Sequence, residues 1–185
     1  MNPLVLTKYG VTLCQLTHEK IELLRQWRND PKIQQFMEYR EEITPEMQEC
    51  WFKKMSELGR DFYFFIEYKN EEIGVINMKD FSDDKTVAEA GVFIYEDKYL
   101  NTDISYRAHL CMFDYYFEHE HLQKFISHIL KSNLRAQRFA QFLGAKLCEN
   151  QENIENQRYE TTKEDYLNNR NRLRFIQREA KLIKK

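Results

Sequence analysis

The sequence lacks an apolar run long enough to cross a membrane. No window approaches the roughly 20 apolar residues that a membrane-spanning helix needs, and the first residues show no charged segment followed by a continuous apolar stretch. We therefore expect a cytoplasmic protein with no membrane span. Its 185 residues, with thirteen Phe and eleven Tyr, can instead bury one substantial core.

Cysteine motifs are also missing. The four cysteines lie far apart, with no Cys-x-x-Cys pair and no histidine at metal-ligand spacing: Cys14, Cys50, Cys111 and Cys148. This pattern argues against a zinc site and against a disulfide framework. We expect no metal and buried, reduced thiols.

Neither sign of charge dominates the whole chain, whose formal net charge is −2. From Arg170 to the end, however, there are seven Lys or Arg and one Glu, so this segment carries +6 and the remainder −8. The overall balance gives no indication of nucleic-acid binding. The basic tail is either a solvated helix face or a patch that attracts anions or membranes.

Helix and strand signals alternate along the chain. Runs of β-branched and aromatic residues between turn residues predict strands, and apolar residues at spacings of three and four predict helices. The expected elements are a strand at 9–16, helices at 18–29, 32–37 and 45–58, strands at 62–68, 73–78 and 87–95, a helix at 105–118, a strand at 125–130, a helix at 133–143, and strands at 146–148 and 157–161.

Two helix starts carry capping residues. Thr17 is the expected N-cap of the first helix, which ends where Asp30-Pro31 blocks continuation. Thr44 precedes Pro45, so a capping hydroxyl stands next to the residue that fits the first helical position best. The second of these signals is the clearer one.

Three antiparallel strands in succession, after two or three helices, exclude a doubly wound parallel sheet. The predicted fold class is α+β, with a mixed, mainly antiparallel central sheet, helices on both faces and a C-terminal basic helix. We expect one domain at residues 1–162 and an amphipathic basic helix at 163–185.

Apolar residues recur along the tail at spacings of three and four: Leu173, Ile176, Ala180 and Ile183. A helix of this length is marginal alone in water and needs a surface that covers its apolar stripe. The domain surface or a second subunit can provide it, and we favour the second option, which predicts a homodimer.

Several short motifs, in this element order, resemble the GNAT acetyltransferase superfamily over residues 9–162. They are Trp27-Arg28-Asn29, Phe36-Met37, Ile43-Thr44-Pro45-Glu46, Trp51-Phe52, and Asn133-Leu134-Arg135-Ala136 followed by Gly144. The front series is similar to a branch that includes N-acetyltransferases acting on nucleotide-linked amino sugars in flagellin and surface-polysaccharide modification. A neighbouring branch is the RimJ/RimL-like group, which acetylates protein N-termini.

The resemblance implies acetyl-CoA as the co-substrate. Its pantetheine arm would pair like an added strand with the backbone at Phe93, Ile94 and Tyr95. Its pyrophosphate would meet backbone N–H groups at the start of the next helix. The corresponding residues are Asn101, Thr102, Asp103 and Ser105, while Asn133 and Phe139 would contact the pantothenate part.

The expected pyrophosphate loop, residues 100–105, contains no glycine. Glycine would let the backbone turn back and approach phosphate closely. Asp103 also places a negative charge where phosphate should bind, at a cost on the order of a kcal/mol. Arg107 or the basic tail can offset this charge, and Asp103→Gly is expected to tighten acetyl-CoA binding.

Acetyl transfer needs a group that removes a proton from the acceptor amine. Glu89 is the expected base, with a surface strand carboxylate as the alternative. Tyr95 or a water would protonate the leaving thiolate, since Ala140 follows Phe139 where many relatives have a tyrosine. By resemblance the acceptor pocket includes Trp27, Arg28 and Asn29, although Trp27 can equally belong to the core and Arg28 to a surface salt bridge.

Two hypotheses follow. The first is an acetyl-CoA-dependent N-acetyltransferase whose acceptor is a small molecule, an amino sugar on a nucleotide, or else a protein N-terminal amine. The second is a GNAT-fold protein that has lost catalysis and serves in binding or assembly.

Overall fold

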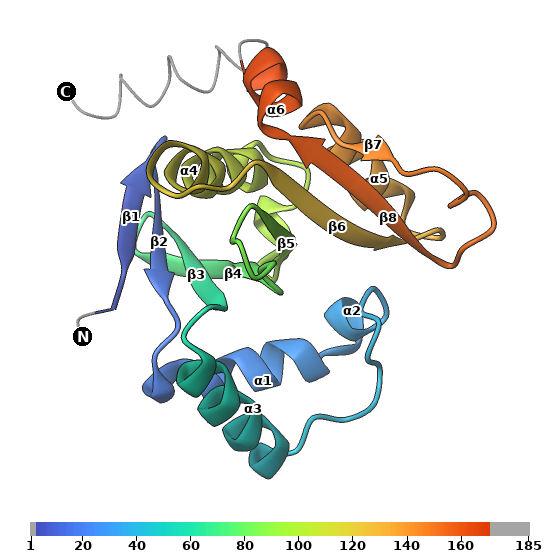
Figure 1. Cartoon of the computed structure of the whole chain (residues 1–185). Coiled ribbons are helices and arrows are strands. Elements are labelled where there is room, and N and C mark those ends of the chain that lie inside the picture. Colours follow the sequence, from blue (N-terminus) through green and yellow to red (C-terminus); the bar gives the residue numbers. More distant parts are fainter. Residues whose placement is uncertain (1–2, 171–185) are drawn as a thin grey trace.

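The computed structural model describes residues 3–170, which form an eight-stranded sheet with helices on both faces (Figure 1). The strands lie in the order β1-β2-β3-β4-β5-β6-β8-β7, and of the neighbouring pairs only β5 and β6 run parallel. The mixed, mainly antiparallel α+β architecture expected from the sequence is confirmed. Among residues 3–170 no helix is long and apolar enough to cross a membrane.

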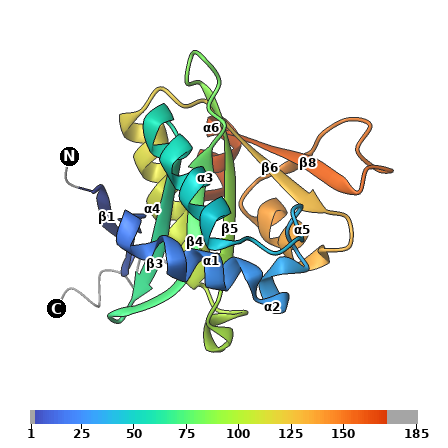
Figure 2. The same ribbon diagram turned by 90° about the horizontal axis from the view of Figure 1, so that it is seen from below.

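The strands are β1 (Val5–Lys8), β2 (Val11–Gln15), β3 (Phe62–Tyr68), β4 (Glu71–Lys79), β5 (Val87–Ile94), β6 (Lys124–Leu130), β7 (Lys146–Leu147) and β8 (Asn156–Thr162). The helices are α1 (Ile21–Asn29), α2 (Pro31–Gln34), α3 (Pro45–Leu58), α4 (Ile104–His119), α5 (Leu134–Phe142) and α6 (Lys163–Arg170). Figures 1 and 2 show α1, α2 and α3 on one face of the sheet and α4 on the other.

The alternation of side chains along β5 divides the core between the two faces. Ala88 and Ala90 join a large cluster with α4, whereas Phe93 packs with Trp27 of α1 and Met55 of α3. We call these faces the α4 face and the α1/α3 face. Glu89, between Ala88 and Ala90, therefore lies on the α1/α3 face.

The capping sequence at the start of α3 behaves as expected. The Thr44 hydroxyl accepts the N–H of Met47 at 3.3 Å, and Pro45 is the first helical residue. Gly59 ends the helix in the left-handed conformation, with φ +62°, which costs glycine little.

Three expectations near the N-terminus were wrong. Residues 9–16 do not form a single strand: Tyr9 and Gly10, with φ of +58° and +75°, make the turn of a hairpin between β1 and β2. Thr17 precedes a 3-10 turn over His18–Lys20 and not α1 itself, and its side chain makes no capping hydrogen bond. The helix expected at 32–37 is α2, which is shorter and begins at Pro31. Tyr9 is an unusual residue in the hairpin turn, and Gly10 was its only sequence signal.

The four cysteines are free, but not all of them are buried. Cys111 is buried in the core, Cys14 and Cys148 are partly exposed, and Cys50 is exposed on α3. The expected burial therefore holds only for Cys111, and the reduced state of the thiols stays a prediction.

Helix α6 packs on the α4 face. Tyr166 is only 1% exposed and belongs to the large core cluster, and Arg170 Nη2 lies 3.0 Å from Asp114 Oδ2. Gly144, at φ +100°, leaves room for Asn169 of α6, because a Cβ at residue 144 would come within 2.6 Å of Asn169 Nδ2. The apolar stripe at Leu173, Ile176, Ala180 and Ile183 lies outside the described residues, and the proposed boundary at 162 stays a prediction.

Candidate functional site

An opening in the sheet lies between β5 and β6. These strands pair only at Val87–Glu89 with Lys124–Ile126, after which β5 continues beside β4 alone. The Ser127 hydroxyl donates to the carbonyl of Ala90 at 3.1 Å, where the two strands separate. Figure 2 shows β6 and β8 diverging from β5, with α5 alongside.

The edge of β5 beside this opening carries backbone groups without a strand partner. Tyr95 donates its N–H to the carbonyl of Ile73 at 2.8 Å, so the odd-numbered residues of β5 direct their polar backbone groups toward β4. Val92 and Ile94 therefore present theirs to the opening. Of the three positions predicted for pantetheine, only Ile94 fits by its backbone; Phe93 and Tyr95 do not, and Val92 was missed.

The loop that follows β5 reaches the left-handed conformation without glycine. Asn101 has φ +62°, and asparagine is among the residues that tolerate this region best. The Thr102 hydroxyl donates to the carbonyl of Tyr99 at 2.7 Å and fixes the turn. The chain thus makes, with Asn101, the sharp turn for which glycine was expected.

Asp103 does not carry an isolated negative charge. Its Oδ2 lies 2.7 Å from Nη2 of Arg107, which is 4% exposed and also donates from Nη1 to the carbonyl of Tyr9 at 3.3 Å. The expected compensation by Arg107 is therefore present, and the electrostatic objection to an anion at this loop is reduced.

The first turn of α4 offers backbone donors. The N–H groups of Ser105 and Tyr106 have no partner among residues 3–170, as is usual at the start of a helix. Together with the helix dipole, such groups favour a bound anion. The loop and helix start therefore fit a pyrophosphate.

Asn133 caps α5 as the sequence predicts. Its Oδ1 accepts the N–H of Ala136 at 3.1 Å, while its Nδ2 has no partner in the described chain and can donate to a ligand. Phe139 packs on Tyr106 and His109 of α4, with ring centroids 4.5 and 4.8 Å apart. Burial lowers the pKa of His109 to about 4, so its ring is neutral.

The three predicted acceptor residues on α1 have different environments. Trp27 is 6% exposed and stacks on Tyr95 with centroids 4.7 Å apart, so it belongs to the core. Asn29 exchanges two hydrogen bonds of 2.9 Å with the backbone of Ile43 and holds the segment that leads into α3. Arg28 makes no salt bridge within residues 3–170, contrary to the surface alternative, and its Nε is buried without a partner.

Tyr95 joins the end of β5 to the junction of α1 and α2. Its hydroxyl donates to Asp30 Oδ2 at 3.1 Å, and Lys32 Nζ lies 3.9 Å from its ring centroid. Burial and the hydrogen bond to Asp30 both raise the pKa of Tyr95. A phenol whose proton is already shared with a carboxylate is a weak candidate for protonating a thiolate, so the structure favours a positioning role.

Glu89 lies where β5 and β6 separate, and both of its oxygens are engaged. Oε1 is 2.9 Å from Lys79 Nζ on β4, and Oε2 is 2.7 Å from His128 Nδ1 on β6. Burial alone would lower the pKa of Lys79, but hydrogen bonds to Asp80 and Glu89 outweigh it and raise that pKa, so the amine stays charged. Sequence reasoning missed Lys79 and His128, because their proximity depends on the register of three strands.

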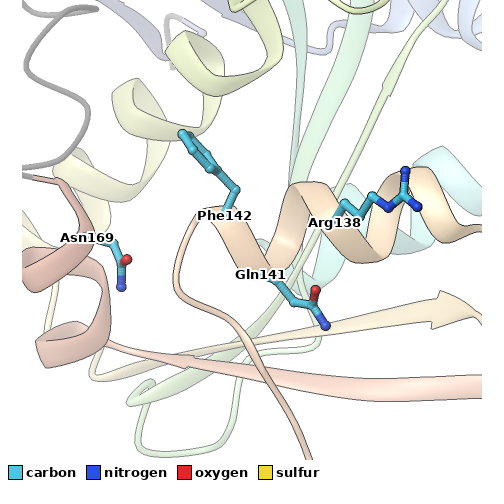
Figure 3. A pocket seen from close by; sticks show the side chains of 4 residues that line it. All are labelled: Arg138, Gln141, Phe142 and Asn169. Carbon is cyan, nitrogen blue, oxygen red and sulfur yellow. The ribbon is translucent and has the colours of Figure 1, made fainter.

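Two further features contribute little to this site. The described chain contains no group of three or more His, Cys, Asp or Glu that could hold a metal ion. A surface hollow between α5 and α6 contains none of the predicted site residues (Figure 3); it is lined by Arg138, Gln141, Phe142 and Asn169.

Comparison with known proteins identifies the family. Residues 11–146, most of the chain, match the family model described as an acetyltransferase (GNAT) domain. The chain belongs to the GNAT acetyltransferase family. This assigns it to the acyl-CoA-dependent N-acetyltransferases, in agreement with the resemblance seen in its motifs. No curated protein sequence matches this GNAT chain.

Solved structures agree with the assigned fold. FdhC, described as a nucleotide-linked sugar GNAT, superposes with a TM-score of 0.73 at 18% identity, covering 94% of this chain and 97% of its own. The ribosomal L7/L12 α-N-protein acetyltransferase RimL gives 0.71 at 14%, covering 86% and 94%. Spermidine N-acetyltransferase from Vibrio cholerae gives 0.75 at 18%, covering 86% and 99%. At these identities the likeness shows the fold alone.

Proposed function

We propose that this GNAT chain transfers the acetyl group of acetyl-CoA to the amine of a nucleotide-linked amino sugar. The family supplies the reaction type. The acceptor class is inferred from the α1/α3 face of the sheet, next to the opening between β5 and β6.

The unpaired guanidinium of Arg28 is the observation that supports the proposal most strongly. Its Nε is buried without a hydrogen-bond partner, and no carboxylate of the described chain pairs with its guanidinium. Burial lowers its pKa, but arginine remains charged at neutral pH. A half-buried cation with an enclosed, unpaired Nε and no counter-charge is unfavourable. A diphosphate would relieve this cost, because guanidinium groups bind phosphate oxygens with paired hydrogen bonds.

Neutral polar groups lie beside Arg28 on the same face. Burial raises the pKa of Tyr63 to about 12, so its phenol is protonated and can donate a hydrogen bond. Neither Tyr63 nor Asn77 makes a side-chain hydrogen bond within residues 3–170, and the two residues pair across β3 and β4. Gly91 leaves room for Asn77, since a Cβ there would approach Asn77 Oδ1 within 2.8 Å. These groups suit the hydroxyls of a sugar.

The cofactor side has matching groups. Val92 and Ile94 offer an unpaired strand edge to pantetheine, the Ser105 and Tyr106 amides offer donors to the pyrophosphate, and Asn133 Nδ2 offers a donor to the pantothenate amide. The N–H of Val92 is the first β5 amide past the separation from β6. It is the candidate donor to the oxyanion that develops during acyl transfer.

The acceptor class separates this proposal from the other chemistries found on the same fold. A polyamine is cationic and would be repelled by Arg28. Spermidine, named in the description of one similar enzyme, is an acceptor of this kind. A nucleotide-linked sugar brings negative charge, and FdhC, whose description names that class, covers nearly the whole chain. A protein N-terminus supplies no diphosphate.

Substitution of Arg28 tests the acceptor class. We expect Arg28→Gln to raise the KM for UDP- or dTDP-linked amino sugars by about 10-fold or more, because the variant loses a charged hydrogen bond to the diphosphate. The KM for the corresponding amino sugar without nucleotide should change little. Arg60→Gln is the matched control, because Arg60 is exposed and pairs loosely with Asp83 at 3.9 Å. Equal effects of Arg28→Gln on both acceptors would contradict the proposal.

A further inference from the structure

Three side chains form a hydrogen-bonded row across β4, β5 and β6. Lys79 Nζ lies 2.9 Å from Glu89 Oε1, and Glu89 Oε2 lies 2.7 Å from His128 Nδ1. The row lies where β5 and β6 begin to separate, since Glu89 with Ile126 is the last pair of their parallel ladder.

Glu89 determines which nitrogen of His128 holds a proton. A carboxylate can only accept hydrogen bonds, so Nδ1 of the neutral imidazole is the donor to Glu89. Nε2 then keeps its lone pair, and it makes no hydrogen bond within the described residues. Glu89, with one oxygen on Lys79 and the other on His128, is less available to accept a proton than Nε2.

His128 points to the face where the acceptor is proposed to bind. Side chains alternate along a strand, so Ile126 and His128 lie on one face of β6 and Ser127, which donates to the carbonyl of Ala90, does not. Because Ile126 is the register partner of Glu89, His128 lies on the same face as Glu89. Its side chain is 38% exposed, which leaves a route for a proton to solvent.

We propose that His128 is the general base of the transfer reaction, with Glu89 as the positioning residue that sets its tautomer and Lys79 holding Glu89. This inference rests on the proposed acetyltransferase function and replaces the expectation that Glu89 itself is the base. Carboxylate and imidazole pairs of this kind are a general way to orient a base.

The acceptor ammonium loses two protons during the transfer. Nε2 of His128 takes one proton from the acceptor ammonium, and the neutral amine attacks the thioester carbonyl carbon of acetyl-CoA. A C–N bond forms and the C–S bond breaks, and the departing thiolate takes the second amine proton to become CoA thiol. His128 then releases its proton to solvent, so that the products are the N-acetylated acceptor, CoA and one proton.

Other charged groups face the same region and will influence its pH dependence. On β8, Arg158 is the register partner of His128, and it pairs with Glu160 at 2.8 Å. Glu160 also binds Lys124 at 2.8 Å, and this hydrogen bond lowers the pKa of Glu160. The remaining groups are Asp80, 2.6 Å from Lys79, and Arg28 and Tyr63.

The experiment measures kcat/KM for CoA release between pH 6 and 9, an interval around neutrality, with acetyl-CoA and a panel of UDP- and dTDP-linked amino sugars. The variants are His128→Gln and Glu89→Gln, and His121→Gln is the matched control because His121 is an exposed histidine before β6. Calorimetric titration with acetyl-CoA and a thermal melt accompany each variant. Hydrolysis of acetyl-CoA without acceptor is followed as well, since attacking water must also lose a proton.

We expect His128→Gln to lower kcat/KM about 100-fold at pH 7, the usual contribution of a general base. The loss should shrink as pH rises and the acceptor amine becomes neutral unaided, while acetyl-CoA affinity stays within about twofold. Glu89→Gln should lose less, because the imidazole remains. A loss of activity in His128→Gln that is equal at every pH, or smaller than twofold, would overturn the assignment.

Failure of the acceptor proposal gives a different result. If no sugar in the panel is acetylated, the nucleotide-sugar class is wrong, and the base is then judged from hydrolysis, which His128→Gln should slow. A wild-type protein that binds acetyl-CoA but releases CoA no faster than buffer overturns the base assignment and supports a purely binding role.

Discussion

The two faces of the sheet treat buried charge in opposite ways. On the α4 face, Asp114 is 1% exposed and is held by Lys8, Tyr9, Tyr166 and Arg170. On the α1/α3 face, Arg28 is half-buried, with its Nε fully enclosed and no carboxylate partner in the described chain. A charge whose partners all come from its own chain serves stability, and a charge without them points to a ligand.

The same contrast separates the histidines. His109, on α4, donates from Nδ1 to the carbonyl of Ser105 and is only 5% exposed, enclosed by Phe113 and Phe139, so a substrate does not reach its ring. His128, on β6, is partly exposed and has one nitrogen with no partner in the described residues. These contrasts agree with a supporting role for the α4 face and with the proposed reaction site on the α1/α3 face and its adjoining opening.

Removal of Asp114 should break the α4 face most strongly. Asp114→Ala removes the buried carboxylate that Lys8 and Arg170 share and leaves them only the exposed Glu118, so we expect a loss of about 3–5 kcal/mol in the free energy of unfolding, measured by urea denaturation. Glu118→Gln is the control: it contacts the same two cations but is exposed, and its loss should stay below about 1 kcal/mol. Equal losses would show that burial does not distinguish the two carboxylates.

His109 should make stability depend on pH. Burial lowers its pKa from 6.5 to about 4, so below pH 6.5 the unfolded chain binds a proton that the folded chain refuses. The contribution is fully present above pH 6.5 and lost as pH falls toward 4, by about 3 kcal/mol in the free energy of unfolding. Urea denaturation from pH 7.5 to 4 should show a steeper loss of stability in the wild type than in His109→Leu. A slope that His109→Leu leaves unchanged would assign it to other groups.

The cofactor loop offers a smaller test. Arg107→Gln leaves the Asp103 carboxylate uncompensated beside the proposed phosphates, and acetyl-CoA affinity should fall about 5-fold, on the order of 1 kcal/mol. Adding Asp103→Asn to Arg107→Gln should restore the affinity for acetyl-CoA. Acetyl-pantetheine, which lacks the pyrophosphate, should bind the wild type, the single variant and the double variant alike. Calorimetry at low salt measures these affinities. If Arg107→Gln weakens both ligands equally, the effect is structural.

Removal of residues 171–185 should affect stability least. Arg170 and Tyr166, which anchor α6, are kept in this variant. If the tail covers a second subunit, as its apolar spacing predicts, light scattering should show the molar mass falling to that of a monomer while the melting temperature changes little. A wild type that is already monomeric would contradict the predicted dimer.

Much of the fold could be read from local sequence. Thr44-Pro45, Gly59 and Asn133 mark helix ends through interactions within one turn, so sequence alone located them. The hairpin at Tyr9-Gly10 escaped because tyrosine rarely adopts positive φ. Its side chain is held there by Asp114, more than a hundred residues away.

The site was harder to predict, because its chemistry depends on contacts between strands. Glu89 could be placed near the opening from its position in β5, but Lys79 and His128 become its neighbours only through the registers of β4 and β6. The glycine-free loop likewise read as an obstacle until Asn101 and the Asp103–Arg107 pair were seen. Arg28 was named by resemblance, and its lack of a partner is visible only in three dimensions.

Wild-type specificity tests the central claim most directly. CoA release would be followed with acetyl-CoA and, in parallel, a nucleotide-linked amino sugar, the same amino sugar without nucleotide, and spermidine. We expect the highest kcat/KM for the nucleotide-linked sugar, by about 10-fold or more over the free sugar, and the lowest for the polyamine. Equal or greater activity on spermidine would contradict the role given to Arg28 and the α1/α3 face.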